Sequence, residues 1–176
     1  ISRKNKKIEN MDHITNECSG ESVIFDGELY AHGLSFQENM KLIKKYRKGE
    51  SEKVKYHVYD IVEPNLSFSE RYQALKDILK LYKPENIELV PTYKINNKEE
   101  LRKYHSQFIG EGYEGTIVRW GEAGYKVDKR SENLLKYKDF IDITAEVIDV
   151  IPSEKRPTHG KLVCKMNEKK WIHKSS

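Results

Sequence analysis

Hydrophobic and polar positions along the chain follow two periods, one typical of helices and one typical of strands. Three helix starts carry a small polar residue three positions before a glutamate, as Ser35…Glu38, Ser67…Glu70 and Asn97…Glu100. The second and third helices each gather apolar residues on one face, and Gly110 ends the third. Both faces are expected to pack on a sheet; they comprise Tyr72, Leu75, Ile78, Leu79 and Tyr82 in one helix and Leu101, Tyr104, Phe108 and Ile109 in the other.

Strand-like runs alternate with these helices and are bounded by Gly, Pro, Asn or Asp. Asp26-Gly27 separates two of the runs and is by itself an ordinary hairpin dipeptide. Later runs at 143–151, 160–166 and 169–173 follow one another without a helix. The pattern predicts a mixed α+β domain over 1–140 and a small, truncated β module over 141–176. The strands predicted in the first domain are Val23–Phe25, Glu28–Ala31, Val54–Val62, Ile87–Tyr93, Gly115–Trp120, Tyr125–Val127 and Leu134–Lys138.

Composition limits the classes of function without selecting one. Lys and Arg number 32 against 28 Asp and Glu in 176 residues, and the net charge of +4 permits nucleic-acid binding without indicating it. No apolar run approaches the ~20 residues that span a bilayer, and no signal-peptide pattern is present, so a soluble cytoplasmic protein is expected. Cys18 and Cys164 lie in no zinc-like cluster, which predicts free thiols that act as small hydrophobes.

Chemistry-bearing side chains concentrate in four fragments: Asp26–Leu29, Tyr56–Asp60, Glu114–Arg119 and Leu134–Lys138. Each has an ordinary structural interpretation, as a turn, a buried aromatic strand or a solvated row of lysines. Together they supply carboxylates for ribose hydroxyls or a metal, an aromatic ring for base stacking and cations for phosphates. The set predicts a site for a nucleoside triphosphate with a divalent metal.

The order of these fragments resembles the covalent nucleotidyltransferases, and within them the ATP-dependent DNA ligases of the small bacteriophage type. The resemblance covers essentially the whole chain, and five motifs stand in the family's order. Asp26–Leu29 is similar to the third family motif, Tyr56–Asp60 to the aromatic strand after it, Glu114–Arg119 to Glu-Gly-x-Val-x-Arg/Lys, Lys136–Lys138 to Lys-x-Lys, and Ser2-Arg3 to the short motif after the nucleophile loop; Lys129–Ser131 also has the family's character.

The resemblance implies roles for individual residues. Glu28 would bind the ribose, Tyr59 would stack on adenine, and Glu114 would support the divalent metal, Mg²⁺ or Mn²⁺. Lys136 and Lys138 would contact the phosphates of ATP, where neutralising charge assists phosphoryl transfer. The remaining cations would face phosphate of the nucleotide or the DNA end at Arg3 and Arg130, and the DNA backbone at Lys155 and Arg156.

The resemblance also implies a fold and a reaction. The fold is an α+β nucleotidyltransferase domain, the ATP-grasp-like adenylation domain of ligases, with antiparallel or mixed sheets and flanking helices, followed by the start of an OB-fold β-barrel. The reaction seals nicks between 3′-hydroxyl and 5′-phosphate ends of duplex DNA through lysyl-AMP and DNA-adenylate, in replication, repair and recombination, and the enzyme is expected to be a monomer. Two alternatives stay open: an RNA ligase or capping guanylyltransferase of the same superfamily, and a non-catalytic remnant that binds nicks.

The nucleophile motif of the family, Lys-x-Asp-Gly, does not occur in the sequence. Ile24 stands where the lysine would be required before Asp26-Gly27. Because the sequence begins one residue before Ser2, the motif is expected to lie upstream of it. A lysine amine is the group that attacks the α-phosphate in this family. We therefore expect that this polypeptide by itself does not form lysyl-AMP.

Overall fold

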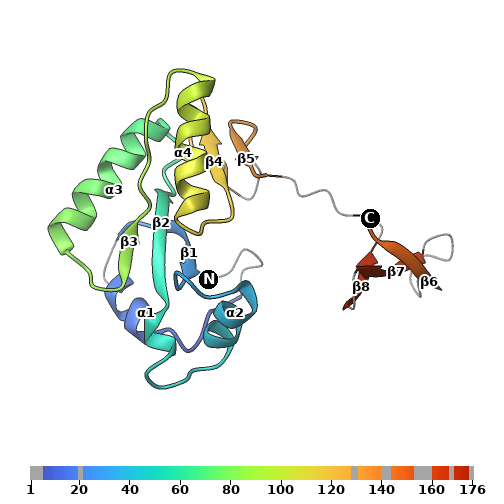
Figure 1. The fold of residues 1–176 in the computed structure, drawn as a ribbon. Helices are drawn as coiled ribbons and strands as arrows, with labels where there is room; N and C mark the ends of the chain where they lie inside the picture. The colour runs from blue at the N-terminus through green and yellow to red at the C-terminus, as the bar shows by residue number, and fades with distance from the viewer. Residues whose placement is uncertain are drawn as a thin grey trace. The chain divides into compact units, whose positions relative to one another are not determined.

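A three-stranded sheet with the order β1-β2-β3 forms the framework of the first of two units (Figure 1). β1 (Phe25–Tyr30) pairs antiparallel with β2 (Lys55–Ile61), and β2 pairs parallel with β3 (Ile87–Leu89). The fold is therefore α+β with mixed pairing, as predicted. The computed structural model describes residues 6–19, 22–127, 131–139, 144–152, 160–166 and 169–174, and its units are Ile1–Lys138 and Asp139–Ser176.

Asp26-Gly27 lies inside β1 and not at a hairpin turn. The register passes from Asp26 opposite Asp60 to Gly27 opposite Val58, so Tyr59 is an extra residue on β2 and the pair contains a β-bulge. The prediction of two strands divided by a turn at this dipeptide is wrong. Glycine is needed here for close approach, because a Cβ atom at Gly27 would lie 2.5 Å from the backbone oxygen of His57.

Side-chain caps begin α2 (Phe36–Lys44), α3 (Phe68–Tyr82) and α4 (Lys98–Gly110), as predicted. Ser35 and Ser67 each form a complete capping box with the glutamate three positions later. At the start of α4 the Asn97 side chain accepts from the Glu100 amide, but the Glu100 carboxylate accepts from the amide of Asn96, 2.7 Å away. The local sequence signal thus located all three helix starts.

The short helix α1 (Asp12–Cys18) was not predicted. Its N-cap residue, Met11, makes no side-chain capping bond, and seven residues are too few for a periodic pattern. Met11 and Ile14 are nevertheless buried, together with Ala31, Leu42 and Val54. Tertiary burial therefore forms this helix. A 3₁₀ turn at Ser51–Lys53 leads from the same region into β2.

A second core cluster joins α3, which lies beside β2 and β3, to the sheet (Figure 1). It consists of Val58, Ile61, Leu75 and Ile87, and half-buried Cys18 packs against it as a small hydrophobe. Tyr82 and Ile109 were expected on packing faces but are exposed. Both lie in the last turn of their helices, beyond the turns that carry the buried residues.

A separate two-stranded antiparallel sheet is formed by β4 (Thr116–Arg119) and β5 (Leu134–Tyr137). The strand predicted at Tyr125–Val127 is wrong. This part of the connection between β4 and β5 pairs with no described strand. Tyr125 contacts α3 instead, with its ring centroid 5.7 Å from the Arg71 guanidinium.

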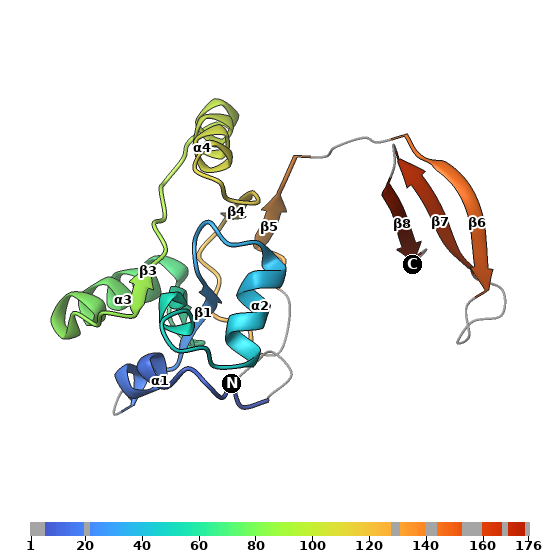
Figure 2. The same ribbon diagram turned by 60° about the horizontal axis from the view of Figure 1, so that its bottom comes forward.

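The second unit is a three-stranded antiparallel sheet (Figure 2). Its strands β6 (Glu146–Pro152), β7 (Gly160–Met166) and β8 (Lys169–Lys174) follow the three predicted runs. Val147 and Val150 on β6 are about half exposed. Across the described ranges of both units, no helix combines the length and the apolar character needed to cross a membrane.

Candidate functional site

One face of the β1-β2-β3 sheet carries the first group of candidate residues. Leu29 and Val58 point to the helix side, where they pack in the two core clusters. Side chains alternate along a strand, so Glu28 points to the opposite face, where it is exposed. Its cross-strand neighbour is His57. Glu28, the predicted ribose ligand, is therefore exposed on the sheet face opposite the two core clusters.

His57 belongs to this face although sequence reasoning did not single it out. Its ring meets the Tyr30 ring edge-on, with centroids 5.5 Å apart, and its Nδ1 atom lies 3.8 Å from the Glu88 carboxylate. Glu88 in turn pairs with Lys55 at 2.5 Å. Burial lowers the pKa of His57, which favours a neutral ring at pH 7. The sequence could have indicated this position, because His57 precedes the buried Val58 on a strand and its side chain therefore points to the opposite face.

Tyr59 is turned by the bulge toward the carboxylate of Asp26. Its hydroxyl donates to Asp26 Oδ1 at 3.3 Å, and the hydroxyl of Tyr125 donates to Asp26 Oδ2 at 2.7 Å. Tyr59 is half-buried and belongs to neither core cluster. Burial, reinforced by the charge of Asp26, raises the pKa of Tyr59 to about 12 and also raises the pKa of Tyr125. Both rings are therefore neutral donors at ordinary pH.

Ionisation of Tyr59 is expected to destabilise the chain at alkaline pH. The folded chain holds this phenolic proton more tightly, because the pKa is raised from 10.0 to about 12. The stabilisation is complete below about pH 10 and is lost as the pH rises through the folded value. Urea unfolding at a series of pH values should show a shallower loss of stability in Tyr59→Phe than in the unmodified chain. The exposed Tyr82→Phe is the control, and an unchanged slope in Tyr59→Phe would contradict the assignment.

The second group of candidate residues lies on the β4–β5 sheet. Lys136 stands opposite Ile117, and Lys138 follows the end of β5. The Lys138 Nζ atom donates to Glu114 Oε2 at 2.5 Å. This bond lowers the pKa of Glu114 and raises the pKa of Lys138. The predicted metal-supporting carboxylate and one predicted phosphate-binding lysine therefore form an ion pair, in which the Glu114 side chain stays 74% exposed.

Aromatic rings connect the two groups. The Tyr30 ring, which meets that of His57, also lies 5.9 Å from the His32 ring, and its hydroxyl lies 3.3 Å from His32 Nδ1. The His32 ring in turn contacts the ring of Tyr113, with centroids 4.9 Å apart. Ring contacts thus lead from β1 to Tyr113, the residue before Glu114.

A buried ion-pair triad fastens the same two sheets together. Asp60 is fully buried and accepts from Arg71 on α3, with bonds of 2.7 and 3.2 Å, and from Arg119 on β4 at 2.8 Å. The Arg119 guanidinium also lies 4.4 Å from the ring centroid of Phe68 and 6.0 Å from that of Tyr59. Sequence reasoning missed this triad, since nothing local marks Arg71 as buried.

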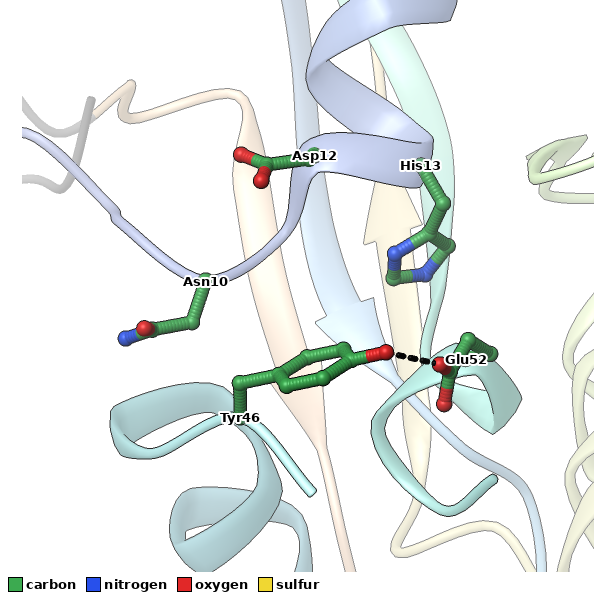
Figure 3. Close-up of a pocket in the computed structure, with 5 residues that line it drawn as sticks. All are labelled: Asn10, Asp12, His13, Tyr46 and Glu52. Atoms are coloured by element: carbon green, nitrogen blue, oxygen red, sulfur yellow. Dashed lines mark hydrogen bonds between the residues drawn. The ribbon is translucent and has the colours of Figure 1, made fainter. Parts of the chain in front are cut away.

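A pocket in the first unit lies away from these residues. This pocket of about 380 Å³ is lined by Asn10, Asp12, His13, Tyr46 and Glu52 (Figure 3). Four of its side chains are hydrogen-bonded, Asn10 and His13 to backbone oxygens and the Tyr46 hydroxyl to Glu52 Oε1 at 2.5 Å. None of the predicted site residues lines it. The remaining predicted contacts, Arg3, Arg130, Lys155 and Arg156, fall outside the described residues.

The first unit has the α+β fold of a ligase nucleotidyltransferase domain, as comparison with known proteins shows. The family model described as "ATP dependent DNA ligase domain" matches residues 1–138, and the chain belongs to that family. The DNA ligase of African swine fever virus is 29% identical over 190 residues, which cover 96% of this chain and 43% of the viral enzyme. The DNA ligase of Haemophilus influenzae is 30% identical over 113 residues, covering 64% of this chain and 42% of that enzyme.

Solved structures of DNA ligases share the fold. A structure from a study of Lig E DNA ligases, described as binding DNA with a minimal scaffold, matches with a TM-score of 0.86 at 20% identity and covers 99% of this chain and 69% of its own. The Chlorella virus DNA ligase-adenylate matches with a TM-score of 0.66 at 24% identity and covers 98% of this chain and 70% of its own. The matched region covers less than half the length of the African swine fever virus ligase and of the Haemophilus influenzae ligase.

Proposed function

We propose that this chain is the nucleotide-holding part of an ATP-dependent DNA ligase, an enzyme that joins 3′-hydroxyl and 5′-phosphate ends in nicked duplex DNA. The observation that carries the proposal is the ion pair of Glu114 with Lys138, which brings together an acidic and a basic residue of two separate motifs 24 positions apart. In this assignment Glu28 binds the ribose and Tyr59 stacks on adenine. Residues 141–176 are proposed as the opening strands of an OB-fold domain that contacts DNA, with Lys155 and Arg156 toward its backbone.

The phosphates are proposed to lie over Lys136 and Lys138. The side chains of Lys138 and Glu114 are 35% and 74% exposed, and ion pairs that water reaches contribute little stability. A triphosphate can therefore replace the carboxylate as the partner of Lys138. That exchange would release Glu114. Charge-assisted contacts from a lysine to a phosphate are among the stronger hydrogen bonds.

A divalent metal fits the released Glu114. Mg²⁺ in nucleotide sites is held by one or two carboxylates together with substrate phosphates, and Glu114 offers an exposed carboxylate for this purpose. The bound ion would neutralise phosphate charge during phosphoryl transfer.

Isothermal titration with ATP and Mg²⁺ tests this assignment directly. Lys138→Ala is expected to weaken ATP binding about tenfold, because it removes a charged hydrogen-bond donor to phosphate. Lys94→Ala, at an exposed position before α4, is the matched control and should bind as the unmodified chain does. Equal affinities for ATP in all three proteins would contradict the phosphate site.

Further titrations separate the ligase from its relatives. Preference for GTP over ATP would favour a capping guanylyltransferase, and tighter binding of nicked RNA than of nicked duplex DNA would favour an RNA ligase. Nick binding without any nucleotide affinity would identify a non-catalytic remnant. Since Lys-x-Asp-Gly is absent from the sequence, labelled ATP is expected to leave no AMP covalently attached to this chain.

A further inference from the structure

The segment after β4 is fastened to the first turn of α3. The Ser69 hydroxyl donates to Glu122 Oε1 at 2.9 Å, and the Ser69 amide donates to Glu122 Oε2 at 3.3 Å. The Arg71 Nη1 atom donates to the backbone oxygen of Ala123 at 3.2 Å. Gly124 lies so close to the chain before α3 that a Cβ atom there would overlap the backbone oxygen of Pro64. These contacts fix the backbone that leads into Tyr125.

Tyr125 connects this fixed backbone to the candidate site through its side chain. Its ring lies 5.7 Å from the Arg71 guanidinium, and its hydroxyl donates to Asp26 Oδ2. The other oxygen of Asp26 accepts from Tyr59. At 2.7 Å the bond from Tyr125 is the shorter of the two, against 3.3 Å for the bond from Tyr59. Tyr125 is thus the stronger constraint on the carboxylate, and the carboxylate in turn constrains the ring of Tyr59.

We propose that Tyr125 is a positioning residue for the nucleotide base, acting through Asp26 to hold the Tyr59 ring in its stacking orientation. The inference rests on the proposed function, because it assigns Tyr59 to the base. A hydrogen bond from a neutral phenol to a carboxylate restricts the carboxylate rotamer, and the loss of one partner frees the other. The connection between β4 and β5 would therefore contribute to affinity for adenine without touching the nucleotide.

Tyr125→Phe in the 176-residue chain tests the proposal, because it keeps the ring and removes only the hydroxyl. We expect affinity for ATP to fall about fivefold, the loss that follows from one hydrogen bond. Affinity for inorganic tripolyphosphate, which has no base, should not change. Quenching of the fluorescence of 1,N⁶-etheno-ATP on binding should also decrease, since it reports stacking on an aromatic ring. Asp26→Asn should produce the same selective loss, and Tyr93→Phe, at an exposed ring, should produce none.

A double-mutant cycle separates positioning from general weakening. In a Tyr59→Leu background, Tyr125→Phe should cost no further ATP affinity, because the ring that it positions is gone. An equal loss for ATP and tripolyphosphate, a fivefold loss that persists in the Tyr59→Leu background, or no loss at all would each overturn the proposal. If the unmodified chain binds neither ATP nor etheno-ATP, the proposed function fails instead, so the two failures are distinguishable.

Discussion

Asp60→Asn is expected to lower the free energy of unfolding by about 3–5 kcal/mol, the usual cost of removing one partner from a buried ion pair. The carboxylate is fully buried and accepts from Arg71, Arg119 and the amide of Ile61. Asparagine removes the charge that balances two guanidinium groups. It also presents an NH₂ donor to guanidinium donors where an oxygen accepted before, so at least one buried donor loses its partner.

Urea unfolding followed by circular dichroism measures this effect. Glu88→Gln is the matched control, because it breaks the Lys55–Glu88 pair, whose side chains are 39% and 44% exposed. That pair should contribute less than about 1 kcal/mol. A loss below about 1 kcal/mol in Asp60→Asn would show that the triad does not hold α3 and β4 to the sheet. Arg119→Met added to Asp60→Asn should recover part of the loss, since it removes one of the uncompensated charges.

Local sequence signals located the features of the fold that depend on neighbouring residues. The capping boxes at Ser35 and Ser67 form as predicted because each involves only four consecutive residues. The short helix α1 escaped prediction because burial of Met11 and Ile14 by distant residues, and not its own pattern, stabilises it. The triad of Asp60, Arg71 and Arg119 was equally invisible, since its members come from three elements far apart in sequence.

The candidate site was likewise predictable where it depends on local sequence and not where it depends on contacts between distant residues. Motif order singled out Glu28, Glu114 and the two lysines as candidates, and all four lie in the first unit. The pairing of Lys138 with Glu114 was not predictable, because it depends on the register of β4 against β5. Tyr125 was assigned to a strand, and its contact with Asp26 spans 99 residues.

Gly27→Ala is expected to cost about 3 kcal/mol of stability and to abolish detectable ATP binding. The added Cβ atom would lie 2.5 Å from the His57 backbone oxygen and 2.8 Å from Cε2 of Tyr56, distances at which β1 and β2 must separate. Overpacking of this kind usually costs about 1–3 kcal/mol, and a clash with backbone belongs at the upper end. The strand segment that moves carries Asp26, which accepts from the Tyr59 hydroxyl, and Glu28, the proposed ribose ligand. Both side chains would therefore be displaced together.

Gly110→Ala provides the control for this substitution. A Cβ atom added at Gly110 would meet no atom within 4 Å, and the residue ends α4 without a positive φ. Alanine there should leave stability unchanged or raise it by up to about 1 kcal/mol, because it restricts the unfolded chain. Thermal unfolding and ATP titration of both variants give the comparison. If Gly27→Ala unfolds and binds ATP as Gly110→Ala does, the strand pair tolerates a side chain at the bulge, and the close approach of β1 to β2 is not what fixes Asp26 and Glu28.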